Sequence, residues 1–139
     1  MKYLYAFGNQ LSGAIPSELG LLSRLESLHM HSNSFQGSLP SEIGSVVGTK
    51  EIVLAENQLT GSLPSELARL SDLYMLYLSK NPGLSGSLPT EYYNWTSVAA
   101  FDISETGITG SIPQSLMAAY NRTSFERYNT ECKRRYPCE

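Results

Sequence analysis

Apolar and polar residues repeat along this chain in one frame, with a period of about 24 residues. Asparagines recur at positions 9, 33, 57 and 81, and each follows two apolar residues separated by a single position. The five copies of the frame read Leu4-x-Ala6-x-x-Asn9, Leu28-x-Met30-x-x-Asn33, Ile52-x-Leu54-x-x-Asn57, Leu76-x-Leu78-x-x-Asn81 and Phe101-x-Ile103-x-x-Thr106. Every copy continues into Gly-x-(Ile/Leu)-Pro, and the fourth carries one extra residue. Such a period predicts a stack of structural repeats in which each coil contacts only its neighbours.

Each position of the frame has a physical role. The apolar alternation predicts a half-buried strand, because successive side chains of a strand point to opposite faces. The asparagines predict an internal ladder, because one side-chain amide can both donate to and accept from buried backbone groups. Its members are Asn9, Asn33, Asn57 and Asn81, and Thr106 replaces the asparagine in the fifth copy. Proline suits the first position of a helical turn. Short helical segments should therefore follow, closed from outside by Leu19, Ile43, Leu67, Tyr92 and Leu116.

Residues 52–67 follow the pattern LxxLxLxxNxLxGxIPxxLGxL almost throughout, and the frame extends over residues 1 to about 120. The chain therefore resembles the plant-type leucine-rich repeat. The resemblance implies an α/β repeat fold, a right-handed solenoid of about five coils of 24–25 residues. It also implies a concave parallel sheet, a second short sheet at Gly-x-Ile-Pro, and short helical or 3-10 turns on the convex side. Such repeats occur in receptor-kinase ectodomains, receptor-like proteins and polygalacturonase-inhibiting proteins, whose shared work is recognition, and they carry over no catalytic residue.

The two ends of the chain differ. Residues 1–121 hold the five repeats, and residues 122–139 resemble a carboxyl-terminal cap. Met1 already occupies a core position of the first repeat, so we expect further repeats or a partner to cover the amino end. Cys132 and Cys138 favour a cap disulfide, because solenoids tend to be stapled at their ends and the family often has cysteines there. Two free thiols are the alternative, and a metal site is disfavoured because neither a Cys-x-x-Cys pair nor a nearby histidine is present.

Two segments, Asn94-Trp95-Thr96 and Asn121-Arg122-Thr123, match the acceptor pattern for N-glycosylation. A three-residue pattern also arises by chance, and repeats of this type often carry asparagine at the first site for packing. Together with the cysteine pair, the two segments favour an extracellular or cell-surface location, although no secretory signal is visible ahead of the first repeat.

Residues between the core leucines point away from the core and form columns on the concave sheet. The candidates for ligand contact are Tyr3, Tyr5, Phe7, His29, His31, Glu51, Met75, Tyr77 and Asp102. Neighbouring strands lie about 4.8 Å apart, so the first five should form one patch. Large aromatic side chains in such positions indicate a partner surface. The alternative is that aromatics favour strands and pack on one another, or that those of the first strand face a preceding coil.

Charge and composition argue against several other classes of function. The net charge of −3 gives no general support to binding of nucleic acid, which requires clustered cations, and no apolar run reaches the ~18 residues of a membrane span. His29 and His31 lack a third metal ligand, and Ser32 and Ser34 beside them lack the acid and oxyanion donors of a catalytic triad. We therefore expect no metal, no cofactor and no enzymatic activity, and we interpret the basic residues 133–135 as solvated surface.

The sequence thus predicts a non-catalytic module that binds a protein, peptide or glycan on its concave face, within a receptor-like or secreted protein. One alternative is the ectodomain of a receptor kinase whose catalytic domain lies elsewhere. The other is a structural repeat protein that binds a wall or ice surface through a column of hydroxyls, Ser38, Ser62, Ser87 and Ser111.

Overall fold

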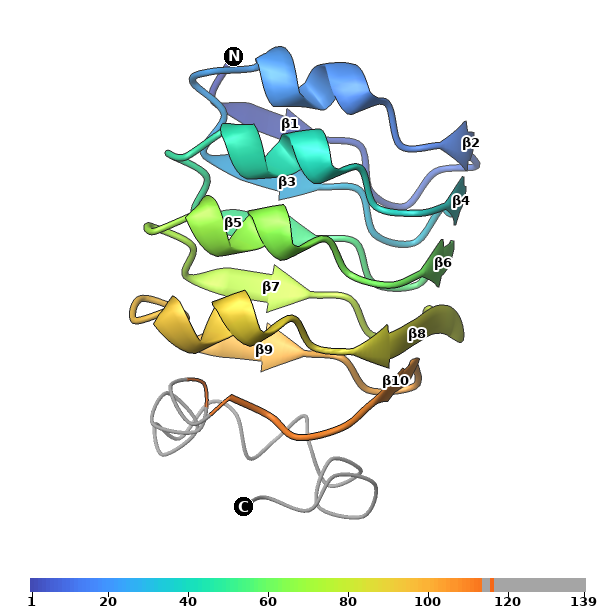
Figure 1. Cartoon of the computed structure of the whole chain (residues 1–139). Coiled ribbons are helices and arrows are strands. Elements are labelled where there is room, and N and C mark those ends of the chain that lie inside the picture. Colours follow the sequence, from blue (N-terminus) through green and yellow to red (C-terminus); the bar gives the residue numbers. More distant parts are fainter. Residues whose placement is uncertain (114–115, 117–139) are drawn as a thin grey trace.

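The computed structural model describes residues 1–113 and 116, which wind through stacked coils (Figure 1). Each coil contributes one strand to each of two parallel sheets. The first sheet contains, in order, β1 (Tyr3–Tyr5), β3 (Ser27–His29), β5 (Glu51–Val53), β7 (Met75–Tyr77) and β9 (Ala100–Asp102). The second contains β2 (Ser12–Ala14), β4 (Ser34–Gly37), β6 (Gln58–Gly61), β8 (Gly83–Ser87) and β10 (Gly107–Thr109). These elements confirm the predicted solenoid.

The second sheet differs slightly from the expected one. It was expected at Gly-x-Ile-Pro, but its strands reach the glycine or a residue beside it and end before the Ile/Leu-Pro pair. Gly37, for example, has a φ of 76°, which carries the chain out of the extended conformation. The register also differs between the sheets. Leu4 pairs with Leu28, 24 positions on, whereas Ala14 pairs with Gln36, 22 positions on.

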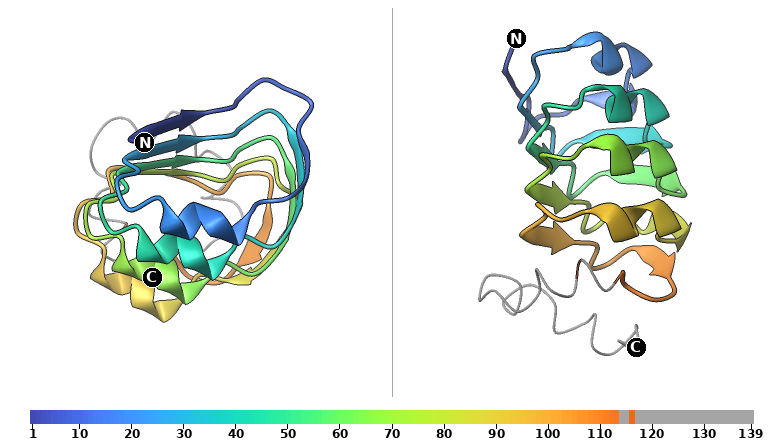
Figure 2. Two further views of the ribbon diagram at one scale, coloured as in Figure 1. Left: turned by 90° about the horizontal axis from the view of Figure 1, so that it is seen from above. Right: turned by 60° about the vertical axis from the view of Figure 1, so that its left-hand side comes forward.

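In the described part of the chain, four short 3-10 helices cover the side opposite the first sheet (Figure 2). They are η1 (Ser17–Leu21), η2 (Ser41–Ser45), η3 (Ser65–Arg69) and η4 (Thr90–Asn94). The proline was expected at the first helical position, but each helix begins one residue after it. Pro16 is extended, with φ −66° and ψ 132°, and its carbonyl accepts the N–H of Leu19 at 3.2 Å. The proline therefore serves as the helix N-cap.

The core fills the space enclosed by the two sheets and the helices. In the third coil four side chains have no exposed surface: Ile52 of β5, Leu54 just after it, Leu59 of β6 and Leu67 of η3. Leu4 in the first coil is only partly buried, because a coil lies on one side of it alone. The inside of the stack is therefore set by the apolar positions of the frame.

The asparagine side chains lie where the chain turns from the first sheet to the second. Asn57 Nδ2 donates to the carbonyls of Leu54 and Ala55 in its own coil and to that of Met30 in the preceding coil, at 3.1–3.2 Å. Its Oδ1 accepts the backbone N–H of Phe35 at 3.0 Å. Asn33 and Asn81 make the equivalent four bonds to their own neighbours.

The ladder is weaker at its two ends. Asn9 is exposed, and its Nδ2 donates only within its own coil, to Ala6 and Phe7. Thr106 is buried; its hydroxyl donates to the Ile103 carbonyl at 2.7 Å and accepts the Ile108 N–H at 3.4 Å. Both bonds lie within the fifth coil. The hydroxyl gives its single proton to Ile103, so it cannot also donate to the preceding coil as an asparagine amide does. The tie to the preceding coil that each inner asparagine makes is therefore missing at Thr106.

Two glycines allow the helices to stack closely. A Cβ placed on Gly44 would lie 2.3 Å from the backbone oxygen of Glu66, and one on Gly20 would lie 2.5 Å from that of Glu42. Neighbouring 3-10 helices can approach this closely only because these positions have no side chain. By contrast, a Cβ on Gly48 would meet no atom within 4 Å.

Candidate ligand-binding surface

Five side chains on or just after the first two strands of the concave sheet form one cluster of ring contacts: Tyr3, Tyr5, Phe7, His29 and His31. Along the first coil, the ring centroids of Tyr3 and Tyr5 are 6.0 Å apart, and those of Tyr5 and Phe7 are 6.4 Å apart. Across to the second coil, Tyr5 lies 4.8 Å from His29, and Phe7 stacks on His31 at 4.7 Å and 8°. We call these five residues the aromatic–histidine patch.

The aromatic members of this patch are open to solvent. Tyr3, Tyr5 and Phe7 are 54%, 57% and 49% exposed. The two histidines are half-buried beside them. A contiguous apolar surface of this kind marks a site where a partner can gain free energy by excluding water.

His29 is held by an acidic neighbour from the third coil. Its Nε2 lies 2.9 Å from Oε2 of Glu51 on β5. A carboxylate accepts, so this nitrogen of His29 donates and the ring orientation is fixed. The sequence pattern predicted that His29 and Glu51 lie on the same face but did not predict the hydrogen bond between them.

His31 has a different environment. Its Nδ1 is buried and has no hydrogen-bond partner among the described residues. Burial lowers the pKa of His31, the nearby His29 lowers it further, and Glu56 acts in the opposite direction. The imidazole of His31 is therefore neutral at neutral pH.

The remaining candidates extend the surface unevenly. Met75 and Tyr77 on β7 are half-buried, and between them and the histidines lies Val53, which is buried. Asp102 on β9 is only 8% exposed, and its Oδ1 accepts the N–H of Ser104 at 2.9 Å. The expectation that Asp102 projects into solvent is wrong, because its carboxylate folds back to cap the end of its own strand. Asp102 therefore orders the backbone below the surface and offers a ligand little exposed area.

A charged column that the sequence reading missed borders the surface where the strands end. Ser32 Oγ donates to Glu56 Oε2 at 2.8 Å, and Lys80 Nζ donates to Glu56 Oε1 at 2.6 Å. The hydrogen bond from Lys80 is the main cause that lowers the pKa of Glu56. These three residues and Glu105 share a φ of 54–57°. Each of them directly precedes a ladder residue, and this shared position in the repeat could have identified the column from the sequence.

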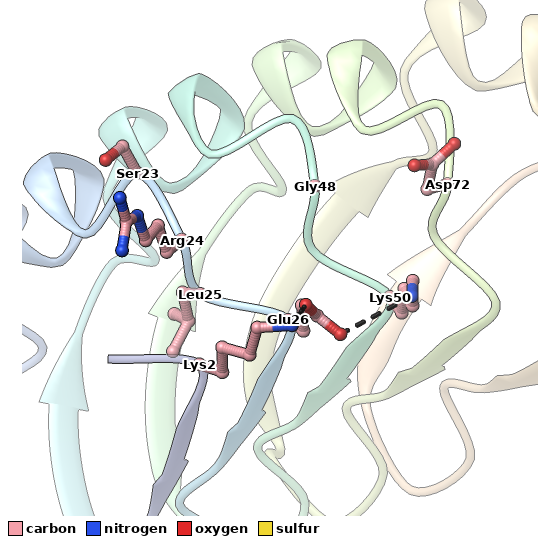
Figure 3. A pocket seen from close by; sticks show the side chains of 8 residues that line it. All are labelled: Lys2, Ser23, Arg24, Leu25, Glu26, Gly48, Lys50 and Asp72. Carbon is pink, nitrogen blue, oxygen red and sulfur yellow. Dashed lines mark hydrogen bonds and ion pairs between the residues drawn. The ribbon is translucent and has the colours of Figure 1, made fainter.

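A shallow depression of about 270 Å³ lies where the strands of the first sheet begin (Figure 3). Glu26 accepts there from Lys2 at 2.7 Å and from Lys50 at 3.4 Å. The hydrogen bond from Lys2 is the main cause that lowers the pKa of Glu26. Arg24 and Asp72 lie on opposite sides of the depression. Its lining carries charges of both signs, so it does not select an ion of one sign.

Several predicted features are placed outside this surface or outside the described residues. Asn94, the first glycosylation candidate, ends η4 and is exposed. Asn121, Cys132, Cys138 and residues 133–135 lie outside the described residues. Within residues 1–113 and 116, no group of three His, Cys, Asp or Glu side chains could hold a metal ion. The same part of the chain contains no helix long and apolar enough to cross a membrane.

Comparison with known proteins defines the class of this fold. The family Leucine Rich Repeat matches residues 24–46. No curated protein sequence matches the chain. With the stacked parallel strands, the asparagine ladder and the structural likenesses given next, this match shows that the chain is a leucine-rich-repeat protein of the plant type.

Solved structures of plant receptors are similar over most of the chain. The plant peptide hormone receptor RGFR1 in complex with RGF2 is 36% identical, with a TM-score of 0.79, over 83% of this chain and 18% of that chain. The ectodomain of the Arabidopsis receptor kinase HAESA, in complex with an extended IDA peptide hormone, is 34% identical, with a TM-score of 0.80, over 86% and 20%. The ectodomain of the receptor kinase SOBIR1 from Arabidopsis thaliana is 28% identical, with a TM-score of 0.79, over 90% and 69%. The chain thus spans about a fifth of the first two.

Proposed function

We propose that this chain is a non-catalytic recognition module that binds a protein or peptide on its concave face, within an extracellular, receptor-like protein. The aromatic–histidine patch carries the proposal. Of the three exposed aromatic rings of the first coil, Tyr5 contacts His29 and Phe7 contacts His31, so a ligand would find apolar area and hydrogen-bonding groups side by side. Aromatic residues in such clusters supply most of the energy of many interfaces.

Two further observations support a peptide over other ligands. The similar RGFR1 and HAESA structures are complexes with RGF2 and with an IDA peptide hormone. In this chain, the Ser32–Glu56–Lys80 column lies beside the aromatic–histidine patch and provides a polar rim. An apolar centre with a polar rim is the usual arrangement of a protein interface. A glycan ligand remains the alternative occupant of the same face.

The proposal includes a second partner surface at the outer side of the first coil. Leu11 and Leu21 there are 44% and 79% exposed, and β1 pairs with β3 alone. Asn9 has the amide geometry of its ladder equivalents without their bonds to a preceding coil. A further leucine-rich coil fits this surface best, because it would offer Asn9 the backbone partners that Asn33 has.

The cap and the glycosylation sites belong to the same proposal. A disulfide between Cys132 and Cys138 and glycans on Asn94 and Asn121 would fit an extracellular protein. Mass spectrometry of non-reduced peptides from protein secreted by a eukaryotic host tests both. A count of two free thiols would remove the disulfide from the proposal.

The binding site is tested with a random peptide library displayed on phage and selected on the immobilised chain. Affinities of the selected peptides are then measured on Tyr5→Ala and His29→Ala. We expect losses of about tenfold or more, as hot-spot side chains give, with melting temperatures close to that of the parent. Glu18→Ala in η1 and Arg69→Ala in η3, on the convex side, are matched controls and should bind like the parent.

The alternative, a repeat protein that binds a wall or ice surface through its column of serines, predicts the opposite result. The serines at positions 38, 62, 87 and 111 are exposed on the edge formed by the second sheet. If a ligand ignores substitutions in the aromatic–histidine patch and loses affinity on Ser62→Val and Ser87→Val, the concave assignment is wrong.

A further inference from the structure

The two ring nitrogens of His31 differ in their surroundings. Nδ1 is buried and has no hydrogen-bond partner among the described residues. Nε2 also has no hydrogen-bond partner among the described residues, but unlike Nδ1 it is not buried. It therefore reaches the surface of the aromatic–histidine patch. The ring is held flat against Phe7, 4.7 Å away and inclined by 8°. Its orientation is therefore fixed before any ligand arrives.

This geometry selects one tautomer. A neutral imidazole carries one N–H, on either Nδ1 or Nε2. A proton on Nδ1 would be a buried N–H without an acceptor, which proteins avoid more strictly than an unused lone pair. A proton on Nε2 leaves only a lone pair at the buried nitrogen. The N–H of His31 therefore points outward.

The charged state is disfavoured by the same arrangement. An imidazolium would place a second N–H on the buried Nδ1, again without an acceptor. The titratable groups near the ring are His29 in the same coil and Glu56 from the third coil, together with Tyr5 and Glu51, which contact His29. Of these only Glu56 favours a proton on His31 directly, and it already accepts from Ser32 and Lys80.

His29, two residues away, cannot play the same part. Its Nε2 already donates to Glu51 at 2.9 Å. Of the two imidazoles of the aromatic–histidine patch, His31 is therefore the one whose Nε2 is not used by another described residue.

We infer that His31 determines specificity on this surface: its Nε2–H donates to a peptide oxygen, either a carbonyl or a carboxylate, of a ligand whose apolar part covers Phe7 and Tyr5. The inference rests on the proposed function and deepens it. It selects ligands that place a hydrogen-bond acceptor next to an apolar group, and it disfavours ligands that present an ammonium or an N–H at that point.

The tautomer is measured without a ligand, by long-range ¹H–¹⁵N NMR of the histidine rings in the full chain at pH 7.5. We expect His31 to be singly protonated, on Nε2. A proton on Nδ1, or a doubly protonated ring at this pH, would overturn the inference whatever the chain binds.

The contact is measured with peptides selected from the phage-displayed library. His31→Phe keeps the stack on Phe7 and removes the donor, and we expect about 3- to 10-fold weaker binding, the size of one hydrogen bond. His31→Gln restores a donor and should recover part of the loss. Arg69→Gln, on the convex side, is the control and should bind like the parent.

The outcomes separate the two proposals. Peptides that lose affinity on Tyr5→Ala but bind His31→Phe as tightly as the parent would refute the role of His31 and leave the proposed function standing. If no selected peptide depends on Tyr5, the proposed function fails, and the ligand contact of His31 fails with it.

Discussion

The side-chain oxygen of Asn57 accepts the backbone N–H of Phe35 across the boundary between two coils, at 3.0 Å, and both residues are buried. The same amide donates to Met30 in the preceding coil and to Leu54 and Ala55 in its own. One side chain thus ties two consecutive coils together at the turn between the sheets. Stability that depends on contacts between neighbouring repeats is the general property of solenoids.

Asn57→Ala should therefore lower the free energy of unfolding by about 1–3 kcal/mol, because it leaves the Phe35 N–H and the Met30 carbonyl buried without this partner. Urea denaturation followed by circular dichroism measures the loss. Asn9→Ala is the matched control: Asn9 is exposed and bonds only within its own coil, so we expect a change within about 0.5 kcal/mol. Equal losses in the two variants would contradict the coupling between coils.

Gly44→Ala should also destabilise the stack, by about 1–3 kcal/mol, because the new Cβ would overlap the backbone of Glu66. Gly48→Ala is the matched control in the same coil. Its Cβ would meet nothing within 4 Å and its φ is not positive, so we expect no loss, or a gain of about 0.4–1 kcal/mol. Thermal melts of the two variants decide the matter, and a loss confined to Gly48→Ala would be inconsistent with the helix packing.

The sequence could predict the solenoid because the frame repeats in register. Strand alternation sends Leu54 inward in any stack of this period, and buried backbone at the turn needs a group such as Asn57. Both follow from local geometry and from the repeat itself. The positions of the strands, the helices and the core therefore required no knowledge of which coils touch.

The details of the surface could not be predicted in the same way. The His29–Glu51 pair and the close approach at Gly44 depend on the exact spacing of neighbouring coils, which the frame does not specify. The exposure of a side chain in an outward column could not be predicted either. Asp102 lies in register with Tyr77, but its carboxylate turns to the N–H of Ser104 and is buried.

Tyr92 should make stability fall at alkaline pH. Its hydroxyl donates to the Pro64 carbonyl at 2.8 Å, its ring stacks on Trp95 at 3.9 Å, and burial raises the pKa of Tyr92 far above 10.0. In the unfolded chain the phenol ionises near pH 10. Its contribution is thus complete below about pH 10 and is lost as the pH rises further, because only the unfolded state then releases the proton. Urea denaturation between pH 8 and 11.5 should show a shallower decline for Tyr92→Phe than for the parent.

The fifth coil should exchange its amide hydrogens faster than the third. Asn81 Oδ1 accepts the Leu59 N–H at 3.0 Å, whereas Thr106 Oγ1 accepts the Ile108 N–H at 3.4 Å and makes no bond to the preceding coil. Local opening of the fifth coil therefore breaks fewer contacts between coils. Hydrogen exchange followed by NMR compares the amides of Ile108 and Leu59. Slower exchange at Ile108 would show that Thr106 replaces the asparagine fully.

Acid should destabilise the chain in two separate pH ranges. The pKa of His31 is lowered from 6.5 by burial, so the stability it contributes is present above about pH 6.5 and is lost as the pH falls toward the lower folded value. The pKa values of Glu26 and Glu56 are lowered from 4.5 by their lysine partners, so their contribution is present above about pH 4.5 and is lost below it.

Urea denaturation at intervals from pH 8 to pH 3 separates the two ranges. His31→Phe should flatten the decline between pH 7 and 5 and leave the lower range intact, while Glu56→Gln should do the reverse. An unchanged decline between pH 7 and 5 in His31→Phe would mean that His31 can take up a proton in the folded chain, and that its buried nitrogen is not the constraint inferred from the structure.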